Sequence, residues 1–434
     1  MKKVAFCTLG CKVNQYETNA MEQKFIQAGY EIVDFSETAD IYVINTCTVT
    51  NMSDKKSRQM IRRAKQLNKN AVVVAVGCYV QTAKEKLESI EELDLILGNN
   101  EKKDIVKYVE EHKNGIKQIK YNDVLHQDEY DEYGFVTHIE QTRAIVKVQD
   151  GCDRFCSYCA IPYARGKVRS RKIENIIEEI TKLAEDGIKE VVVTGIHIAS
   201  YGKDLKENIG LIDVLEKINE IEGIQRIRLG SLEPMLINEN FLNRLSKLEK
   251  ICHHFHLSLQ SGCDETLKRM NRRYTTEEFR NVVKLLRSTY DDVILTTDII
   301  VGFPGETEEE FEKTYEFLKE INFYKMHIFK YSKRDGTKAA IMPNQIAPNI
   351  QEERSRKLIE LSNKNQEKYN ASYIGKTVQV LFEEKNNDYI KGHTQNYLVV
   401  NIKGDIEKFH NQVVQVKITS ELGEDLLGNT VIQM

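Results

Sequence analysis

The sequence contains no tryptophan and only five prolines in 434 residues. It has no Gly/Ser-rich or repetitive tract, and no apolar run approaches the roughly 18 residues that a membrane-spanning helix requires. These absences argue against a low-complexity protein and against a membrane partner. Hydrophobic residues make up 41% and charged residues 29%, which predicts a globular chain of two or three domains. The net charge of -4 argues against a uniformly basic nucleic-acid-coating protein, although local basic patches stay compatible with it.

The chain also lacks the signs of a secreted protein. It begins Met1-Lys2-Lys3-Val4, without the long apolar segment of a signal peptide. Its nine cysteines are an odd number, which does not suit a disulfide framework in so long a chain. We therefore expect a cytoplasmic protein with reduced thiols.

Three of the cysteines fall within eight residues and form a Cys-x3-Cys-x2-Cys run, called the loop trio below: Cys152, Cys156 and Cys159. Thiolates are the usual ligands of iron-sulfur clusters, and a cubane cluster needs four contacts. Three cysteines in one loop predict a cluster with one iron open to a non-protein ligand. A structural zinc site is the alternative, but it normally closes with four Cys or His ligands, and no fourth ligand lies near Cys159.

The first hundred residues alternate strand-like and helix-compatible runs, with strands predicted at 4–9, 41–46, 71–77 and 95–98. This pattern predicts a parallel α/β domain. Three cysteines follow three of these strands and are called the dispersed trio: Cys11, Cys47 and Cys78. Because the carboxyl ends of parallel strands share one edge of the sheet, the trio is expected to converge and to form a second cluster. Inert core thiols are the alternative, and that is our interpretation of Cys7, Cys252 and Cys263.

A second alternation predicts six strands, at 143–149, 190–197, 226–232, 254–260, 294–301 and 326–331, separated by helices. Six βα units indicate an open or partial barrel, with the loop trio at its carboxyl mouth. The fourth strand places His254, His256, Ser258 and Gln260 on one face, and Asp298 is expected to join this polar lumen. Zinc bound by Cys252 and the neighbouring histidines is the alternative to a polar lining. The charged segment 102–140 is predicted to be a linker.

After a charged helical segment at 351–369, short strands at 377–382, 397–400 and 413–418 predict a small β-barrel. Basic side chains are concentrated elsewhere, in the runs 55–69 and 165–172, each of which flanks one cysteine trio. Solvated surface is the simpler interpretation of one such run. Two runs beside two predicted metal sites favour a polyanionic substrate.

The loop trio, with Tyr158 before its last cysteine, resembles the signature of radical S-adenosylmethionine enzymes. With Thr-Leu-Gly-Cys-Lys-Val-Asn at 8–14, Asn-Thr-Cys-Thr-Val at 45–49 and Gly-Cys at 77–78, the resemblance narrows to the methylthiotransferases, and the wording of 10–18 is most similar to their threonylcarbamoyladenosine tRNA branch. The resemblance implies an N-terminal α/β domain (1–115), a central partial (βα)6 radical SAM barrel (138–368) and a C-terminal TRAM-like β-barrel (371–434).

The resemblance also implies cofactors and partners. The loop trio would hold a 4Fe-4S cluster whose open iron binds S-adenosylmethionine, and the dispersed trio an auxiliary 4Fe-4S cluster that carries the sulfur. The reaction would convert N6-threonylcarbamoyladenosine at position 37 of tRNA to its 2-methylthio derivative. The implied partners are the anticodon region of tRNA, a low-potential electron donor and a sulfur donor.

Contacts to S-adenosylmethionine are expected from Gly195, Ser231 and Glu233, at the ends of the second and third barrel strands. The family's usual Gly-Gly-Glu stretch is replaced here by Thr-Gly-Ile-His at 194–197, so only Gly195 carries over. The loop 302–307 is also at a strand end, and capping of the next helix explains it equally well.

Other functions stay open at this point. The same clusters would serve a methylthiotransferase acting on isopentenyl-adenosine tRNA or on a ribosomal-protein aspartate. A two-cluster electron carrier would not need the open iron or the polar barrel. An RNA-binding module with structural metal would keep RNA binding, and modify nothing, after replacement of Cys152.

Overall fold

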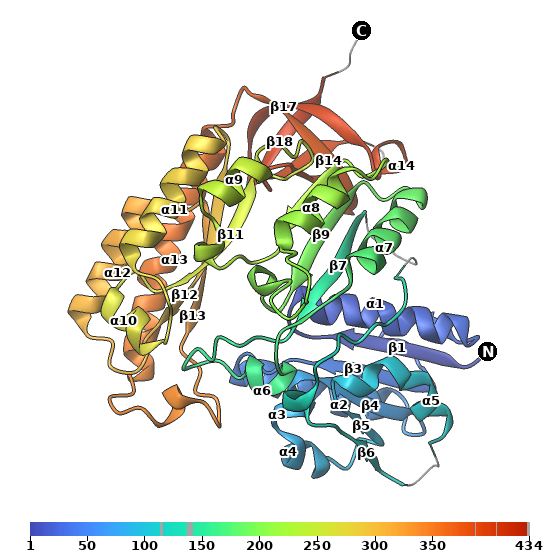
Figure 1. Cartoon of the computed structure of the whole chain (residues 1–434). Coiled ribbons are helices and arrows are strands. Elements are labelled where there is room, and N and C mark those ends of the chain that lie inside the picture. Colours follow the sequence, from blue (N-terminus) through green and yellow to red (C-terminus); the bar gives the residue numbers. More distant parts are fainter. Residues whose placement is uncertain (113–115, 137–141, 387, 405, 432–434) are drawn as a thin grey trace.

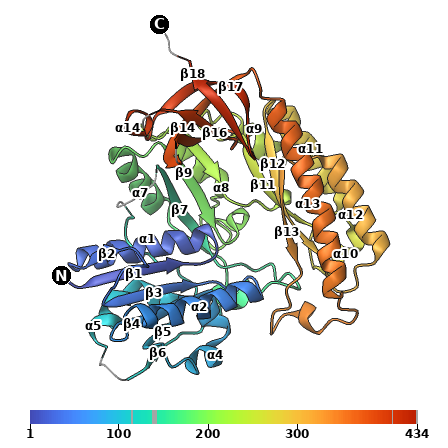
Figure 2. The ribbon, with the colours of Figure 1, turned by 180° about the vertical axis from the view of Figure 1, so that it is seen from behind.

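The computed structural model describes residues 1–112, 116–136, 142–386, 388–404 and 406–431. An N-terminal α/β unit and a C-terminal barrel lie at opposite ends of a central curled sheet (Figures 1 and 2). This arrangement confirms the predicted fold class. The predicted domain limits at residues 115, 138 and 434 lie outside the described residues.

The N-terminal unit is a six-stranded parallel sheet in the order β2-β1-β3-β4-β5-β6. Its four inner strands are those predicted, and long apolar runs made them recognisable because both faces of the sheet are covered. The strands are β1 (Lys3–Thr8), β2 (Glu31–Val33), β3 (Ile41–Thr46), β4 (Val72–Gly77), β5 (Leu95–Leu97) and β6 (Gln118–Lys120). The helices are α1 (Lys12–Gln27), α2 (Asn51–Leu67), α3 (Cys78–Thr82), α4 (Lys84–Glu88), α5 (Ile105–Glu110) and the 3-10 turn η1 (Asn100–Asp104).

Much of the segment predicted to be a linker is part of the folded structure. Strand β6 adds an edge to the sheet at residues 118–120. Ile105 and Val109 of α5 are buried in one core cluster with side chains of β1, β3, β4 and β5. Farther along, Tyr133 and Val136 are buried against Tyr16 and Ala20 of α1. The sequence pattern missed these elements because a three-residue edge strand and isolated aromatic anchors have no periodicity.

The central unit contains the six predicted parallel strands. Its two sheets, β8-β7-β9-β10 and β11-β12-β13, are joined by the bridges Ile227–Ile251 and Leu232–Leu257 into one open barrel. The strands are β7 (Arg143–Asp150), β8 (Arg169–Ser170), β9 (Glu190–Gly195), β10 (Arg226–Leu229), β11 (His254–Gln260), β12 (Ile294–Val301) and β13 (Lys325–Lys330). The helices are α6 (Ile161–Arg165), α7 (Ile173–Glu185), α8 (Leu211–Asn219), α9 (Glu239–Leu245), α10 (Asp264–Arg269), α11 (Thr276–Thr289), α12 (Glu308–Ile321) and α13 (Pro348–Ala371). The amphipathic helices cover the outer face of the sheet, as Figure 1 shows for α11 and α12.

The C-terminal unit is a closed barrel in the order β14-β15-β16-β18-β17. Its elements are β14 (Thr377–Asn386), β15 (Tyr389–Thr394), β16 (Val399–Lys403), α14 (Ile406–Phe409), β17 (Val413–Leu422) and β18 (Asp425–Thr430). Three of the five strands overlap those predicted, whereas β15 and β18 were not recognised.

This small barrel covers the amino ends of the central strands. Tyr397 stacks on His254 at a ring separation of 4.7 Å, and the Arg228 guanidinium carbon lies 4.7 Å from the Tyr397 ring centre. Arg226 donates to the carbonyl of His393 at 2.8 Å. The carboxyl mouth is therefore the end of the central barrel that faces the N-terminal unit (Figure 1). No helix in the described ranges is both long and apolar enough to cross a lipid bilayer.

Candidate metal centres and substrate lumen

The loop trio follows β7 directly and is shaped by its own backbone. Gly151 has φ of +73°, and a Cβ built there would lie 1.6 Å from the carbonyl oxygen of Lys167. Only glycine fits this position, because neither the conformation nor the space accepts a side chain. The Cys152 amide donates to Gly166 O at 3.0 Å, and the Cys159 amide donates to Cys156 O at 3.0 Å. These bonds fold the loop so that its thiols gather at the carboxyl mouth, as predicted.

Ser157 anchors the same loop to the far side of the barrel. Its amide donates to Met270 O at 3.0 Å, its hydroxyl donates to Arg269 O at 2.8 Å, and its carbonyl accepts from the Ala339 amide at 2.7 Å. Burial raises the pKa of Cys152 to about 11 and that of Cys159 to about 12. These thiols are therefore protonated in the absence of metal, and a cationic metal group would displace their protons as it binds.

The dispersed trio converges because its three strands are neighbours in the order β1-β3-β4. Cys11 is the N-cap of α1, Cys47 follows β3, and Cys78 is the first residue of α3. A Cβ on Gly10 would lie 2.9 Å from both Cβ and Sγ of Cys47, and φ at Gly10 is +105°. Burial raises the pKa of Cys47 to about 11, with a further contribution from the neighbouring Cys78 and Cys11. The three cysteines thus lie at the carboxyl edge of the sheet, as expected from the ends of their strands.

The spacing of the sulfurs separates a cluster from a single zinc ion. Four thiolates around zinc, at bonds of about 2.3 Å, hold their sulfurs about 3.8 Å apart. All six cysteines belong to the described residues. In each trio, at least two of the three Sγ atoms lie more than 4.8 Å apart. A cubane cluster spreads its cysteine sulfurs farther apart than one ion does. As they stand, the three thiols of each trio are therefore too far apart for one zinc ion to bind all of them.

A buried ionic network lies beside Cys78. The carboxylates of Glu17 and Asp150 meet three cations, Lys102, Lys147 and Arg165. Burial alone would raise the pKa of Glu17, but the charges of Arg165, Lys102 and Lys147 hold it well below its usual range. Arg169 is a fourth cation, 3.8 Å from Asp150. Two anions and four cations leave an excess positive charge, which is costly in a dry interior unless another anion is near. Thiolate-bound iron at Cys78 would supply that anion.

Helix α6 connects the two trios. At its start, the Ile161 amide donates to Cys159 Sγ at 3.4 Å. At its end, Arg165 Nε donates to Cys78 Sγ at 3.2 Å, and Arg165 Nη2 donates to Asn14 Oδ1 at 2.6 Å. A five-residue helix is about 7.5 Å long. One short rigid element therefore sets the distance between both candidate centres.

The three residues predicted to contact S-adenosylmethionine lie at the same mouth. Gly195 ends β9, and a Cβ there would lie 2.8 Å from Gln149 O, so packing against β7 already requires glycine. Ser231 is exposed, one residue before the bridge between β10 and β11. Glu233 is buried and pairs with Arg154 of the loop and with His197, whose Nε2 lies 2.9 Å from the Glu233 carboxylate. Burial opposes ionisation of Glu233, yet His197, Arg154 and Arg272 lower its pKa to about 2.

The polar lumen was predicted in part. His256 Nε2 lies 3.1 Å from Asp298 Oδ2, and the His256 and His327 rings are 5.7 Å apart. Ligand atoms of these three residues all lie within 4.8 Å of one another. His253 instead pairs with Asp292 outside this group, and among the described residues Cys252 and the histidines beside it do not form a group whose ligand atoms all lie within 4.8 Å of one another. Sequence reasoning missed His327, whose only signal is its register opposite Asp298 in the neighbouring strand.

One of the two basic runs does not form a free surface. Arg165, Arg169 and Arg171 are almost fully buried, and Arg171 pairs with Glu179 and Glu132. The expectation of a polyanion-binding run at 165–172 is therefore wrong for these three arginines. The run on α2 is different, because Lys55, Lys56 and Arg62 are exposed.

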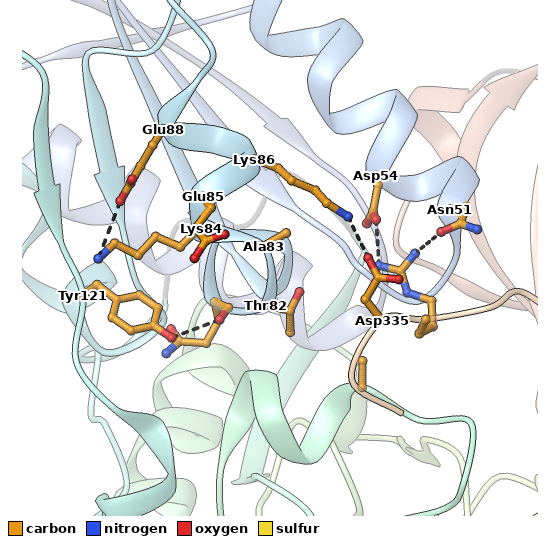
Figure 3. A pocket seen from close by; sticks show the side chains of 13 residues that line it. Asn51, Asp54, Thr82, Ala83, Lys84, Glu85, Lys86, Glu88, Tyr121 and Asp335 are labelled. Carbon is orange, nitrogen blue, oxygen red and sulfur yellow. Dashed lines mark hydrogen bonds and ion pairs between the residues drawn. The ribbon is translucent and has the colours of Figure 1, made fainter. Parts of the chain in front are cut away.

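A polar pocket of about 600 Å³ lies between α3, α4 and the loop after β13 (Figure 3). Its charges largely neutralise one another. Arg334 donates to Asp54 at 2.7 Å and to Asn51 at 2.7 Å, and Lys86 pairs with Asp335 at 2.8 Å. The loop 302–307 is likewise accounted for, since Thr307 caps α12 and Glu306 pairs with Arg354. Neither feature contains any of the six cysteines of the two trios.

Three family models match successive parts of the chain. They are "Uncharacterized protein family UPF0004" over residues 3–98, the Radical SAM superfamily over residues 146–318, and the TRAM domain over residues 371–430. The three boundaries follow the three structural units.

Relatives match over nearly the full length, and two of them illustrate the range. A Bacillus subtilis protein named threonylcarbamoyladenosine tRNA methylthiotransferase MtaB is 41% identical, covering 96% of this chain and 94% of its own. A Clostridium perfringens tRNA-2-methylthio-N(6)-dimethylallyladenosine synthase is 35% identical, covering 99% and 98%. Among solved structures, the radical S-adenosylmethionine methyltransferase TsrM from Kitasatospora setae superposes with a TM-score of 0.57 at 16% identity, covering 76% and 73%. That last likeness is one of fold.

Proposed function

We propose a substrate and a division of labour for this chain, which belongs to the radical S-adenosylmethionine methylthiotransferase family. It is an enzyme of that family, and membership implies a 4Fe-4S cluster and S-adenosylmethionine. The substrate we propose is N6-threonylcarbamoyladenosine at position 37 of tRNA, converted to its 2-methylthio derivative. The higher identity to the relative named for that nucleoside, 41% against 35%, supports this choice over an isopentenyl-type adenosine.

The two cysteine trios have different roles in this proposal. The loop trio holds the cluster that binds S-adenosylmethionine, with Gly195, Ser231 and Glu233 around the cofactor, and the dispersed trio holds an auxiliary 4Fe-4S cluster. When bound, these groups supply a 5'-deoxyadenosyl radical and the sulfur to be inserted, chemistry that side chains cannot provide. The chain itself positions them. Arg165 fixes Cys78 relative to the loop trio, and Glu233 holds Arg154 and His197 at the mouth.

The observation that carries the proposal is the bridge between the trios. A lone radical SAM site does not require a second set of converging thiols, and α6 joins one set to the other through Cys159 and Cys78. We further propose the anticodon region of tRNA as partner, a low-potential electron donor, a sulfur donor and a cytoplasmic location. The exposed lysines of α2 provide a basic surface beside the dispersed trio for the RNA backbone.

The test is mass spectrometry of tRNA nucleosides from a host that lacks the modification. The host expresses the wild type, Cys152→Ala or Cys78→Ala, and Cys252→Ala serves as a matched buried cysteine outside both trios. We expect the methylthio derivative of threonylcarbamoyladenosine with the wild type and the control variant alone.

The two site variants are expected to differ from each other. Purified Cys78→Ala should still release 5'-deoxyadenosine under reduction, whereas Cys152→Ala should release none. Methylthiolation by Cys78→Ala would contradict the auxiliary cluster. An unmodified tRNA pool with iron-loaded wild type would contradict the substrate.

A further inference from the structure

The polar group of His256, Asp298 and His327, called the lumen cluster below, has no role in the chemistry proposed for the two cysteine trios. His256 on β11, Asp298 on β12 and His327 on β13 project from three adjacent strands, and His327 is exposed. Thr296 fixes the His256 ring from its other nitrogen, with Nδ1 and Oγ1 2.9 Å apart. The ring of His256 is thus held between Thr296 and Asp298, whereas His327 presents a free edge.

A fourth polar group comes from the N-terminal unit. Lys12 is the first residue of α1 and follows Cys11 of the dispersed trio. Its side chain is exposed and makes no hydrogen bond or ion pair with any described residue. A lysine in the first turn does not stabilise its helix, because that end carries the positive pole of the helix dipole. The position of Lys12 therefore calls for a reason other than helix stability.

The start of α1 is directed toward the lumen. The helix packs against β7 and β9, and its first turn faces β13 across the open side of the curled sheet (Figures 1 and 2). Burial lowers the pKa of His327, Asp298 opposes this, and the charges of His256, Lys325 and Lys12 lower it further. The charge of Lys12 thus acts on the same space as the two histidines.

We propose that Lys12 and His327 bind the carboxylate of the threonine side chain on the modified adenosine, while Asp298 accepts a hydrogen bond from its hydroxyl or urea N–H. This inference rests on the proposed function and names the residues that determine its specificity. An amino-acid appendage offers both an anion and donors, and the lumen offers the ammonium group of Lys12 and an imidazole N–H of His327 beside the carboxylate of Asp298. An isopentenyl group would leave Lys12 and His327 unpaired, which disfavours it.

A divalent metal ion is the competing occupant, because two histidines and one carboxylate are a known ligand set for transition metals. The unpaired Lys12 favours the carboxylate, since a cation beside an empty dication site would repel the metal. The same variants can therefore decide between the two occupants.

The experiment compares two anticodon stem-loop RNAs on the reconstituted full-length enzyme. One carries threonylcarbamoyladenosine and the other its carboxyl methyl ester, which removes only the negative charge. For the wild type we expect kcat/KM to be about 10- to 100-fold lower on the ester, the range of one lost charged hydrogen bond. In Lys12→Met and His327→Phe, the ratio of kcat/KM on the acid to kcat/KM on the ester should fall to about 3 or below.

Controls separate this outcome from damage to the clusters. His253→Phe, outside the lumen, should keep the wild-type ratio, iron content and 5'-deoxyadenosine release, and His327→Phe should keep the wild-type iron content. An unchanged ratio in both lumen variants, or no discrimination by the wild type, overturns the inference while the proposed function stands. If the wild type modifies neither RNA, the proposed function fails as well. A stoichiometric metal other than iron that is lost in His327→Phe, with the ratio unchanged, assigns the site to a metal instead.

Discussion

The two cysteine trios reach similar geometry by different means. The loop trio is local, since eight residues and one glycine turn bring its thiols together, with Ser157 as the anchor. The dispersed trio depends on the sheet order β1-β3-β4 and on a buried network whose partners are up to 151 residues apart. A local site is sensitive to single backbone positions. A dispersed site is sensitive to the tertiary contacts that keep separate elements in register.

The largest effect is expected at the glycine before the loop trio. Gly151→Ala places a Cβ within 1.6 Å of Lys167 O and forces φ of +73° on alanine. We expect loss of 5'-deoxyadenosine release and a fall in the free energy of unfolding of more than about 4 kcal/mol. Urea denaturation and high-performance liquid chromatography of the product measure both quantities.

A second glycine gives the matched control. Gly187 has φ of +86°, and a Cβ there would meet nothing within 4 Å. Gly187→Ala should therefore lower the free energy of unfolding only by the conformational strain of the alanine, about 1–2 kcal/mol. The variant should keep full activity. Equal effects of the two substitutions would mean that the loop trio does not depend on this turn.

The next effect is expected at the contact between the trios. Arg165→Met removes the donor to Cys78 and leaves Glu17 and Asp150 with fewer cations in a dry interior. Breaking such a buried pair costs about 3–5 kcal/mol. We expect iron content to fall toward half, because the dispersed trio loses its iron first. Metal analysis measures the iron content, and denaturation measures the free energy of unfolding. Arg62→Met, in an exposed pair with Glu92, should change neither, and wild-type iron retention by Arg165→Met would contradict a dependence of the dispersed trio on this network.

The same contrast explains what the sequence alone could predict. The loop trio is evident from spacing, and the inner strands β3 and β4 from continuous apolar runs. The convergence of the dispersed trio followed from parallel-sheet topology. The edge strands β2 and β6 have three residues each and are partly exposed, so no pattern revealed them.

The misread and missed residues depend on distant partners. Arg165 was taken for a surface cation because local composition does not show that Glu17, 148 residues away, is its partner. His327 and Lys12 were missed because their proximity to Asp298 or to the lumen depends on strand register and on the packing of two units. Charge counts along the sequence cannot distinguish a solvated cation from a buried one.

A smaller effect is expected where the N-terminal unit meets the loop after β13. Arg334 donates to Thr48 at 2.6 Å, one residue past Cys47, and to Asp54 at 2.7 Å. Arg334→Ala leaves both oxygens without this donor, at a cost of about 1–3 kcal/mol. Iron of the dispersed trio should be lost faster in air, whereas 5'-deoxyadenosine release should persist. If 5'-deoxyadenosine release were lost in air as fast as the iron of the dispersed trio, the two trios would not respond independently.

The smallest effect is expected at a surface contact between the same two units. Lys86 and Asp335 pair at 2.8 Å, but their side chains are 61% and 84% exposed, so water and salt screen the pair. Lys86→Ala should change the free energy of unfolding by no more than about 0.5 kcal/mol and leave iron retention unchanged. The pair thus serves as the exposed counterpart of Arg334, measured by the same denaturation and aeration assays. If Lys86→Ala matched Arg334→Ala, burial would not be what secures the dispersed trio, and general contact between the two units would explain its stability instead.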